Sequence, residues 1–385
     1  MKLKCNKIKL YEAIINVSKA VATKSNITAL EGIKLSLNKD DLELTGFDME
    51  LGIKTNINVI SDDKGELIVN SRLFSEIVRR MSSDDVDIEI DEKLNVTISG
   101  NNTQYNISAI PADEYPVLPQ IESDKSIDIP QYILKNMIDH TNHAVSTNEN
   151  KPILTGELFD IEDGLFRMIA IDGFRLAIRT EKIMCSENSH FVVPSKTLNE
   201  VSRLLAKGDQ SKSSDPDTEN NSEEIVSEEL CRIFTDNKHI TFEISGYYII
   251  SRLLEGEFHN YKASIPDNYS TEVILKTKDF AESIERCSLL INEKNKSPVR
   301  CLFENNSFKI DCKTSIGKIN DSIDGEIYGE NIEIGFNNKF LTDALKACDT
   351  DKIKLQLLAP NRPVKIVPIT GDSFMFLLMP IQLKK

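Results

Sequence analysis

One amphipathic segment occurs three times in the sequence, and this repeat limits the folds that the chain can adopt. SRLFSEIVRRM (71–81), SKTLNEVSRLL (195–205) and NKFLTDALKAC (338–348) align without gaps, and each has a polar residue, a base, an acid at the sixth position and a base at the ninth. The apolar residues follow the spacing of an amphipathic helix, and the first polar residue is a typical N-cap. In the first copy the expected buried stripe comprises Leu73, Phe74, Ile77, Val78 and Met81. The chain is therefore expected to contain three tandem copies of one domain.

The three copies are unevenly spaced because of one acidic insert. Ser195 lies 124 residues after Ser71, whereas Asn338 lies 143 residues after Ser195. The segment 207–224 contains no apolar residue, so it cannot offset the entropy cost of becoming ordered. We expect a disordered insert at about 207–229 whose removal leaves the function intact. The expected domains span 1–121, 127–264 (which includes the insert) and 266–385.

Each domain is predicted to be α+β. Further amphipathic helices are predicted at 7–22, 131–145 and 278–291, so every domain has two. Short alternating segments broken by turn signals, such as GELFDIEDGLFRMIAI (156–171), lie between the helices and are typical of antiparallel hairpins. The predicted fold is three tandem repeats of a domain with two helices and antiparallel sheet.

Composition excludes several classes of protein. No apolar run approaches the roughly 20 residues that a membrane helix needs, and the N-terminal MKLKCNKIKL is too charged for a signal peptide. We therefore expect a cytoplasmic protein without a membrane partner. The seven cysteines include no C-x-x-C pair, so we expect reduced, mostly buried thiols and neither a metal nor a cofactor site.

The positive charge of this acidic chain is concentrated on predicted helices. The net charge is −15, yet residues 7–24, 71–81 and 195–207 carry +3, +2 and +2, and the other three predicted helices are neutral. One such helix would be explained by a solvated surface, whereas three copies in register favour a shared surface. Helices of this kind can line a lumen that tolerates nucleic-acid phosphates, while the outside repels them.

Three motifs give the repeat a family resemblance. PADEYP (111–116) closes the first unit, DGFRLA (172–177) lies in the second, and MPIQL (379–383) ends the third. In this order the chain resembles the bacterial sliding clamp, the β subunit of the replicative DNA polymerase. The resemblance implies a non-catalytic, head-to-tail homodimer of six domains around double-stranded DNA. It also implies as partners the replicative DNA polymerase, an ATP-dependent clamp loader and other proteins with a clamp-binding peptide.

The resemblance assigns a peptide-binding cleft to the second and third domains. Its implied residues are Leu154, Ile171, Gly173, Phe174, Arg175, Leu176, Asn337, Phe340, Pro363, Leu377, Leu378, Met379, Pro380 and Ile381. An apolar groove would bury the Leu and Phe anchors of a peptide, and Arg175 with backbone amides would orient it. The chain departs from the family pattern at Ile171, Phe174, His259 and Ser264, which puts the peptide preference in doubt.

The resemblance and the repeat together suggest DNA-facing residues and a dimer seam. The implied DNA contacts are Lys24, Arg72, Asn148, Pro152 and Ile153, and the repeat adds Arg79, Arg80, Lys196 and Arg203. At the seam Ile107 of one subunit is expected to meet Leu289 and Leu290 of the other. All three would equally be explained as core residues within their own domains.

Other interpretations stay open at this point. The Asp172-Gly173 turn could be a plain β-turn, although the first unit reads LTGFDMELGIKT (44–55) at the equivalent place and lacks Asp-Gly-x-Arg. His140 and His143 could bind a metal in an enzyme, or be polar residues of a lumen-facing helix. No Walker, H-E-x-x-H or G-x-S-x-G motif supports an enzyme. A monomeric repeat scaffold that binds peptides is the second alternative.

Overall fold

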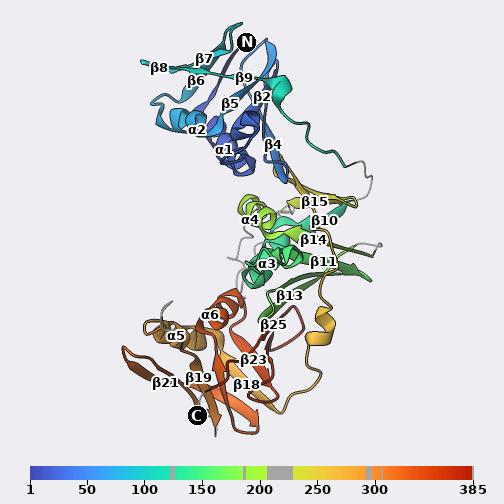
Figure 1. Ribbon diagram of the computed structural model, residues 1–385, viewed down its shortest axis with the longest axis vertical. Coiled ribbons are helices and arrows are strands. Elements are labelled where there is room, and N and C mark those ends of the chain that lie inside the picture. The colour runs from blue at the N-terminus through green and yellow to red at the C-terminus, as the bar shows by residue number, and fades with distance from the viewer. Residues whose placement is uncertain (122–125, 185–187, 206–228, 292–296, 305–306, 384–385) are drawn as a thin grey trace, which may run out of the picture. The chain divides into compact units, whose positions relative to one another are not determined.

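The computed structural model describes residues 1–121, 126–184, 188–205, 229–291, 297–304 and 307–383. Residues 207–228 of the predicted insert lie outside the described residues. The chain forms two compact units, Met1–Tyr132 with Arg203–Leu253 and Ile133–Ser202 with Leu254–Lys385, and each unit is described by itself (Figure 1). The middle repeat contributes one sheet to each unit.

The first unit contains two antiparallel sheets. The smaller has the order β1 (Lys2–Asn6), β6 (Asp85–Ile90), β7 (Asn95–Gly100) and β8 (Thr103–Ser108). The larger has the order β10 (Ile127–Pro130), β15 (Leu230–Thr235), β16 (His239–Ile244), β17 (Tyr247–Arg252), β4 (Leu51–Asn58), β3 (Asp41–Phe47), β2 (Gly32–Asn38), β5 (Lys64–Asn70) and β9 (Ile110–Pro111). Pairing of β17 with β4 makes one continuous sheet from the first and second repeats.

The second unit contains one long antiparallel sheet. Its order is β14 (Ser189–Pro194), β11 (Gly156–Glu162), β12 (Leu165–Ile171), β13 (Arg175–Lys182), β25 (Phe374–Leu378), β24 (Val364–Pro368), β23 (Lys352–Leu357), β18 (Thr271–Lys276), β21 (Lys318–Gly329), β20 (Ser307–Lys313), β19 (Val299–Glu304) and β22 (Ile332–Phe336). Here β13 of the second repeat pairs with β25 of the third. In both units, therefore, the sheets of two neighbouring repeats are joined by pairing one strand of each, and we call such a pairing a join.

All six predicted helices are present. They are α1 (Lys7–Val17), α2 (Ser71–Arg80), α3 (Gln131–Thr141), α4 (Ser195–Leu204), α5 (Thr277–Ser288) and α6 (Asn338–Ala347). Short 3₁₀ turns, Ser18–Ala20 and Asn142–Ala144, follow α1 and α3, which explains why those helices end earlier than predicted. In each outer repeat the two helices pack against each other, α1 on α2 and α5 on α6 (Figure 1).

The predicted N-caps are one residue too late. The side chain of Asn70 accepts a hydrogen bond from the Leu73 amide, and that of Asn337 accepts from the amides of Lys339 and Phe340. Ser71 and Asn338 are therefore the first residues of their helices. The error arose because two adjacent residues could each act as a cap, and only the backbone geometry separates them.

The first residue of each second helix has another role, because its side chain contacts the end of the first helix. Ser71 and Ser18 share a hydrogen bond of 2.9 Å, Ser195 donates to Asn142 at 2.5 Å, and Asn338 donates to Ser288 at 2.8 Å. The same contact thus joins the helix pair of all three repeats. It explains why a small polar residue recurs at this position.

The predicted stripe of α2 is buried with one exception. Phe74, Ile77, Val78 and Met81 are buried, whereas Leu73 is 46% exposed, so its placement in the core was wrong. Leu73 lies at the edge of the apolar stripe, where side chains of an amphipathic helix are partly exposed to solvent. Its equivalent in the third repeat is Phe340, which is half-buried.

One core position breaks the apolar pattern. Glu157 on β11 is fully buried, where the equivalent residues of the other repeats are Ile33 and Val299. Its Oε2 and the Thr141 hydroxyl share a hydrogen bond, and its Oε1 has no hydrogen-bond partner. Burial raises the pKa of this carboxyl to about 8.

Candidate functional site

The pairing of β13 with β25 brings the Asp172-Gly173 turn next to the end of the third repeat. Leu176 lies opposite Leu377, and Arg175 opposite Leu378. Beyond the ladder the Met379 amide donates to the Phe174 carbonyl at 2.8 Å, and the Ile381 amide donates to Gly335 at 2.8 Å. Two groups of predicted cleft residues, far apart in the sequence, are therefore neighbours within one unit.

The floor of this region is apolar. Ile171, Leu176 and Leu377 are buried in one cluster, and Leu154 packs against it. Leu378 faces the opposite side of the sheet and belongs to the core of the third repeat. The sequence did not separate these two sides, because Leu377 and Leu378 are equally apolar and only the strand alternation distinguishes them.

The Asp172-Gly173 turn is held by its own aspartate. Asp172 Oδ1 accepts hydrogen bonds from the Phe174 amide at 2.8 Å and the Arg175 amide at 3.0 Å. Gly173 has φ +92°, and a Cβ at this position would meet no atom within 4 Å. Backbone conformation alone, and not lack of space, therefore favours glycine here.

The same turn occurs in the first repeat without the Gly and the Arg. Asp48 Oδ1 accepts from the amides of Glu50 and Leu51 at 3.0 and 2.7 Å, and Met49 has φ +78°. The Arg252 amide donates to the Glu50 carbonyl at 2.9 Å, as Met379 does to Phe174. The backbone geometry of the turn therefore recurs, although the Asp-Gly-x-Arg sequence does not. What distinguishes the second repeat is the set of side chains on the turn.

Arg175 is occupied by contacts within the protein. Its side chain is 8% exposed, its Nε lies 3.0 Å from Asp172 Oδ2, and its Nη1 lies 2.7 Å from Asp343 Oδ2 on α6. The guanidinium also lies over the Phe340 ring, 4.4 Å from the centroid. These contacts of Arg175 join β13 to α6.

The remaining cleft residues differ in role and in exposure. Asn337 is the N-cap of α6, and Met379 is 43% exposed beside the turn. Pro363, Pro380 and Ile381 are half-buried. Two of the four departures from the family pattern contact each other, because His259 Nε2 lies 3.3 Å from the Ser264 hydroxyl.

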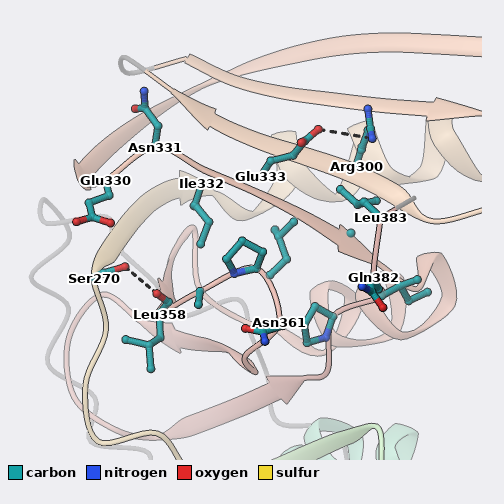
Figure 2. A pocket seen from close by; sticks show the side chains of 16 residues that line it. Ser270, Arg300, Glu330, Asn331, Ile332, Glu333, Leu358, Asn361, Gln382 and Leu383 are labelled. Atoms are coloured by element: carbon teal, nitrogen blue, oxygen red, sulfur yellow. Dashed lines mark hydrogen bonds and ion pairs between the residues drawn. The ribbon is translucent and has the colours of Figure 1, made fainter. Parts of the chain in front are cut away.

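The sequence did not point to a cavity beside the C-terminal tail. It has a volume of about 770 Å³, and β22, the loop 358–361 and the tail 380–383 surround it (Figure 2). Arg300 and Glu333, paired at 3.5 Å, lie on its wall. Residues from five separate segments form this cavity, and no local motif marks it.

His140, on α3, and His143, in the 3₁₀ turn Asn142–Ala144 that follows it, both pack against aromatic side chains. His140 is buried, lies 3.4 Å from Asp349 through Nε2, and packs near Phe374 and Phe376. His143 packs edge-on against Phe376, and burial with the nearby Arg175 charge lowers its pKa to about 4. No group of three metal-ligating side chains is found among the residues that the structure describes. The sequence did not predict this packing, because the aromatic partners come from the end of the chain.

The predicted DNA-facing residues are mostly exposed. This holds for Lys24, Arg72, Arg79, Arg80, Asn148, Pro152, Lys196 and Arg203. Arg79 and Arg80 pair with Glu76 at 2.7 and 3.1 Å. Ile153 differs, because it packs against the apolar cluster of the second unit.

The three predicted seam residues were alternatively explained as core residues of their own domains. This alternative is wrong for Leu289 and is weakened for Ile107 and Leu290. Leu289 is 81% exposed. Ile107 and Leu290 are half-buried in their own repeats. Leu290 approaches Gly317, where a Cβ would lie 3.3 Å from its side chain.

Comparisons with known proteins agree with this architecture. Family models of the DNA polymerase III beta subunit match residues 1–119 (N-terminal domain), 128–214 (central domain) and 262–382 (C-terminal domain). The beta sliding clamp of Bacillus subtilis is 32% identical over 395 residues, covering 99% of this chain and 100% of that protein. The Bacillus subtilis sliding clamp structure superposes with a TM-score of 0.91 at 31% identity, covering 100% of both chains. A putative beta subunit from Eubacterium rectale gives 0.89 at 32%, covering 99% of both chains.

The class of protein follows from these observations. In the described part of the chain, no helix has both the length and the apolar character required to cross a membrane. The repeat architecture, the two equivalent joins and the matches over the whole chain agree. The chain belongs to the DNA polymerase III beta subunit family and is a sliding clamp, a non-catalytic processivity factor.

Proposed function

We propose that two copies of this chain close head to tail into a ring around double-stranded DNA. The proposal is carried by two strands that correspond to the strands paired between neighbouring repeats but that do not pair with each other within one chain. In the two internal joins, the edge strand of one repeat (β4 or β13) pairs with the last strand of the next (β17 or β25). The equivalent strands are β21 of the third repeat and β8 of the first.

Both of these strands have a free edge among the described residues. Strand β8 is the last strand of its sheet. Strand β21 pairs with β20 through residues 318–324 and with β18 through residues 325–329, so its first half has one open edge. Free edges of this length invite pairing with another chain. A second copy supplies both missing partners by symmetry.

The register of the internal joins predicts the seam. Ser251 lies opposite Leu51 and Leu378 opposite Arg175, and these pairs correspond to Ile107 opposite Gly317. Leu290 lies beside Gly317 in the same repeat. Leu289 corresponds to His143, which packs on Phe376 across the internal join. Ile107 of one copy would therefore bury Leu289 and Leu290 of the other.

The basic residues of the helices are proposed to face the DNA. Lys24, Arg72, Arg79, Arg80, Lys196 and Arg203 supply weak phosphate contacts, with Asn148, Pro152 and Ile153 nearby in the family pattern. Glu76 already neutralises part of the charge of α2. Few free cations imply weak binding that falls with salt, which suits a protein that slides.

The cleft of the second unit is proposed to bind partner peptides. Its apolar floor and exposed rim fit short segments with Leu and Phe anchors from the replicative polymerase, an ATP-dependent clamp loader and other partners. Tethering keeps the polymerase at high local concentration near the DNA. We retain the domain limits 1–121, 127–264 and 266–385, and we place this activity in the cytoplasm, where the chromosome lies.

Molar mass in solution tests the ring. Light scattering after gel filtration at micromolar concentration is expected to give twice the 43.4 kDa of one chain. Leu289→Lys would place a charge in the apolar seam and is expected to give monomers. Val117→Lys is the matched control, because Val117 is 88% exposed and lies outside the proposed seam. A monomeric native protein would favour the repeat scaffold instead.

A further inference from the structure

Two aromatic side chains at the edge of the cleft form an exposed stack. Phe174, on the turn, is 62% exposed. Its ring stacks on Phe340 of α6, with centroids 6.3 Å apart and planes 28° apart. Phe340 also contacts the Arg175 guanidinium. We call Phe174 and Phe340 the aromatic shelf.

The fold does not require this shelf. The equivalent turn of the first repeat keeps its hydrogen bonds with Glu50 and Leu51 in place of Phe174 and Arg175. The turn itself therefore does not need an aromatic side chain at position 174.

Asp343 fixes the base of the shelf. Asp172 holds Arg175 Nε, and Asp343 holds Nη1 at the other end of the guanidinium. With both ends held, the guanidinium plane is fixed against the Phe340 ring. Loss of Asp343 would leave one end free and let the guanidinium rotate away from the ring.

The first repeat uses the equivalent acid differently. Asp343 is the acid at the sixth position of the repeated segment. Its counterpart Glu76 pairs with Arg79 and Arg80 on its own helix. In α6 the acid instead contacts a residue 168 positions away in the sequence.

We propose that Asp343 is a positioning residue that holds the aromatic shelf through Arg175, and that the shelf takes the aromatic anchor of a partner peptide. This inference rests on the proposed peptide-binding function of the cleft. An aromatic anchor gains ring stacking on the shelf that a leucine anchor lacks, which corresponds to roughly three- to tenfold in affinity. Asp343 thereby affects selectivity between anchors more than it affects the overall fold.

Two labelled peptides test the selectivity. The two peptides differ only in their final anchor residue, which is Phe or Leu. Fluorescence anisotropy gives the Kd of each peptide for the native protein and for the variants Asp343→Asn and Phe340→Leu. Glu76→Gln is the matched control. The native protein and the control are expected to prefer the Phe peptide by roughly three- to tenfold. In Asp343→Asn and Phe340→Leu the two Kd values are expected to become nearly equal. Phe340→Leu leaves the pair of Arg175 with Asp343 intact, so it tests the shelf even if Asp343→Asn fails to fold.

An optical readout separates positioning from stability. The chain contains no tryptophan, so Phe174→Trp introduces a single reporter on the shelf. Adding Asp343→Asn is expected to lower the anisotropy of this tryptophan at an unchanged melting temperature. An unchanged preference for the Phe peptide in Asp343→Asn or Phe340→Leu overturns the proposal. Failure of the native protein to bind either peptide refutes the cleft function itself, which is a different result.

Discussion

Glu157 is expected to make the stability of the clamp depend on pH, and replacing it with isoleucine is expected to remove this contribution. The residue is fully buried on β11, and the equivalent positions hold Ile33 and Val299. After the change the Thr141 hydroxyl still donates to the Met137 carbonyl at 2.8 Å, so no new unpaired polar group arises.

The magnitude follows from the raised pKa. Burial moves the pKa of Glu157 from 4.5 to about 8. The folded state then holds a proton that the unfolded state releases above pH 4.5, so stability is lost as pH rises from 4.5 to 8. At pH 7 the loss is about 3 kcal/mol at 1.36 kcal/mol per pKa unit.

Urea unfolding followed by circular dichroism measures the effect. The gain in unfolding free energy from Glu157→Ile is expected to grow by about 3 kcal/mol between pH 4.5 and pH 7 and to level off above pH 8. The control Glu92→Gln alters an exposed carboxyl and should show no such trend. A gain that is constant between pH 5 and pH 8 would refute a protonated core carboxyl.

Three further predictions concern capping, DNA contact and the insert. Asn70→Ala removes the α2 cap and is expected to lower the unfolding free energy by about 1 kcal/mol, measured by urea unfolding; no change would contradict the capping role. Arg72→Gln together with Lys196→Gln is expected to weaken duplex binding in low salt and to reduce the dependence of binding on salt, measured by fluorescence anisotropy. An unchanged salt dependence would place these residues away from the DNA. Deletion of 208–228 is expected to leave loading and processive synthesis intact, and collapse of either would assign the insert a function.

The repeated sequence pattern predicted the fold well because its signals depend on residues that are close in the sequence. Helical periodicity and hairpin turns depend on neighbouring residues, and the six helices and the hairpin at 156–171 are confirmed by α1 to α6 and by β11 with β12. The cap positions were wrong by one residue because Asn70 and Ser71 are both suitable caps. The sequence predicted the positive net charge of α2 correctly. That Glu76 pairs with Arg79 and Arg80 and neutralises part of this charge could be seen only in the structure.

The cleft could be outlined from the sequence only through the family motifs. Its internal contacts could not be predicted, because Arg175 and Asp343 are 168 residues apart and meet through the pairing of β13 with β25. The burial of His140 and His143 depends on Phe374 and Phe376 in the same way. Such contacts follow from tertiary pairing, which no local pattern encodes.

The topological link to DNA is the central claim, and retention on DNA tests it most directly. The protein is loaded onto nicked circular plasmid with its loader and ATP, and the bound fraction is measured by gel filtration before and after the plasmid is linearised. A closed ring is expected to stay on the circle and leave the linear form. Equal retention on both forms would mean ordinary DNA affinity, and no retention on the circle with an active loader would contradict the ring.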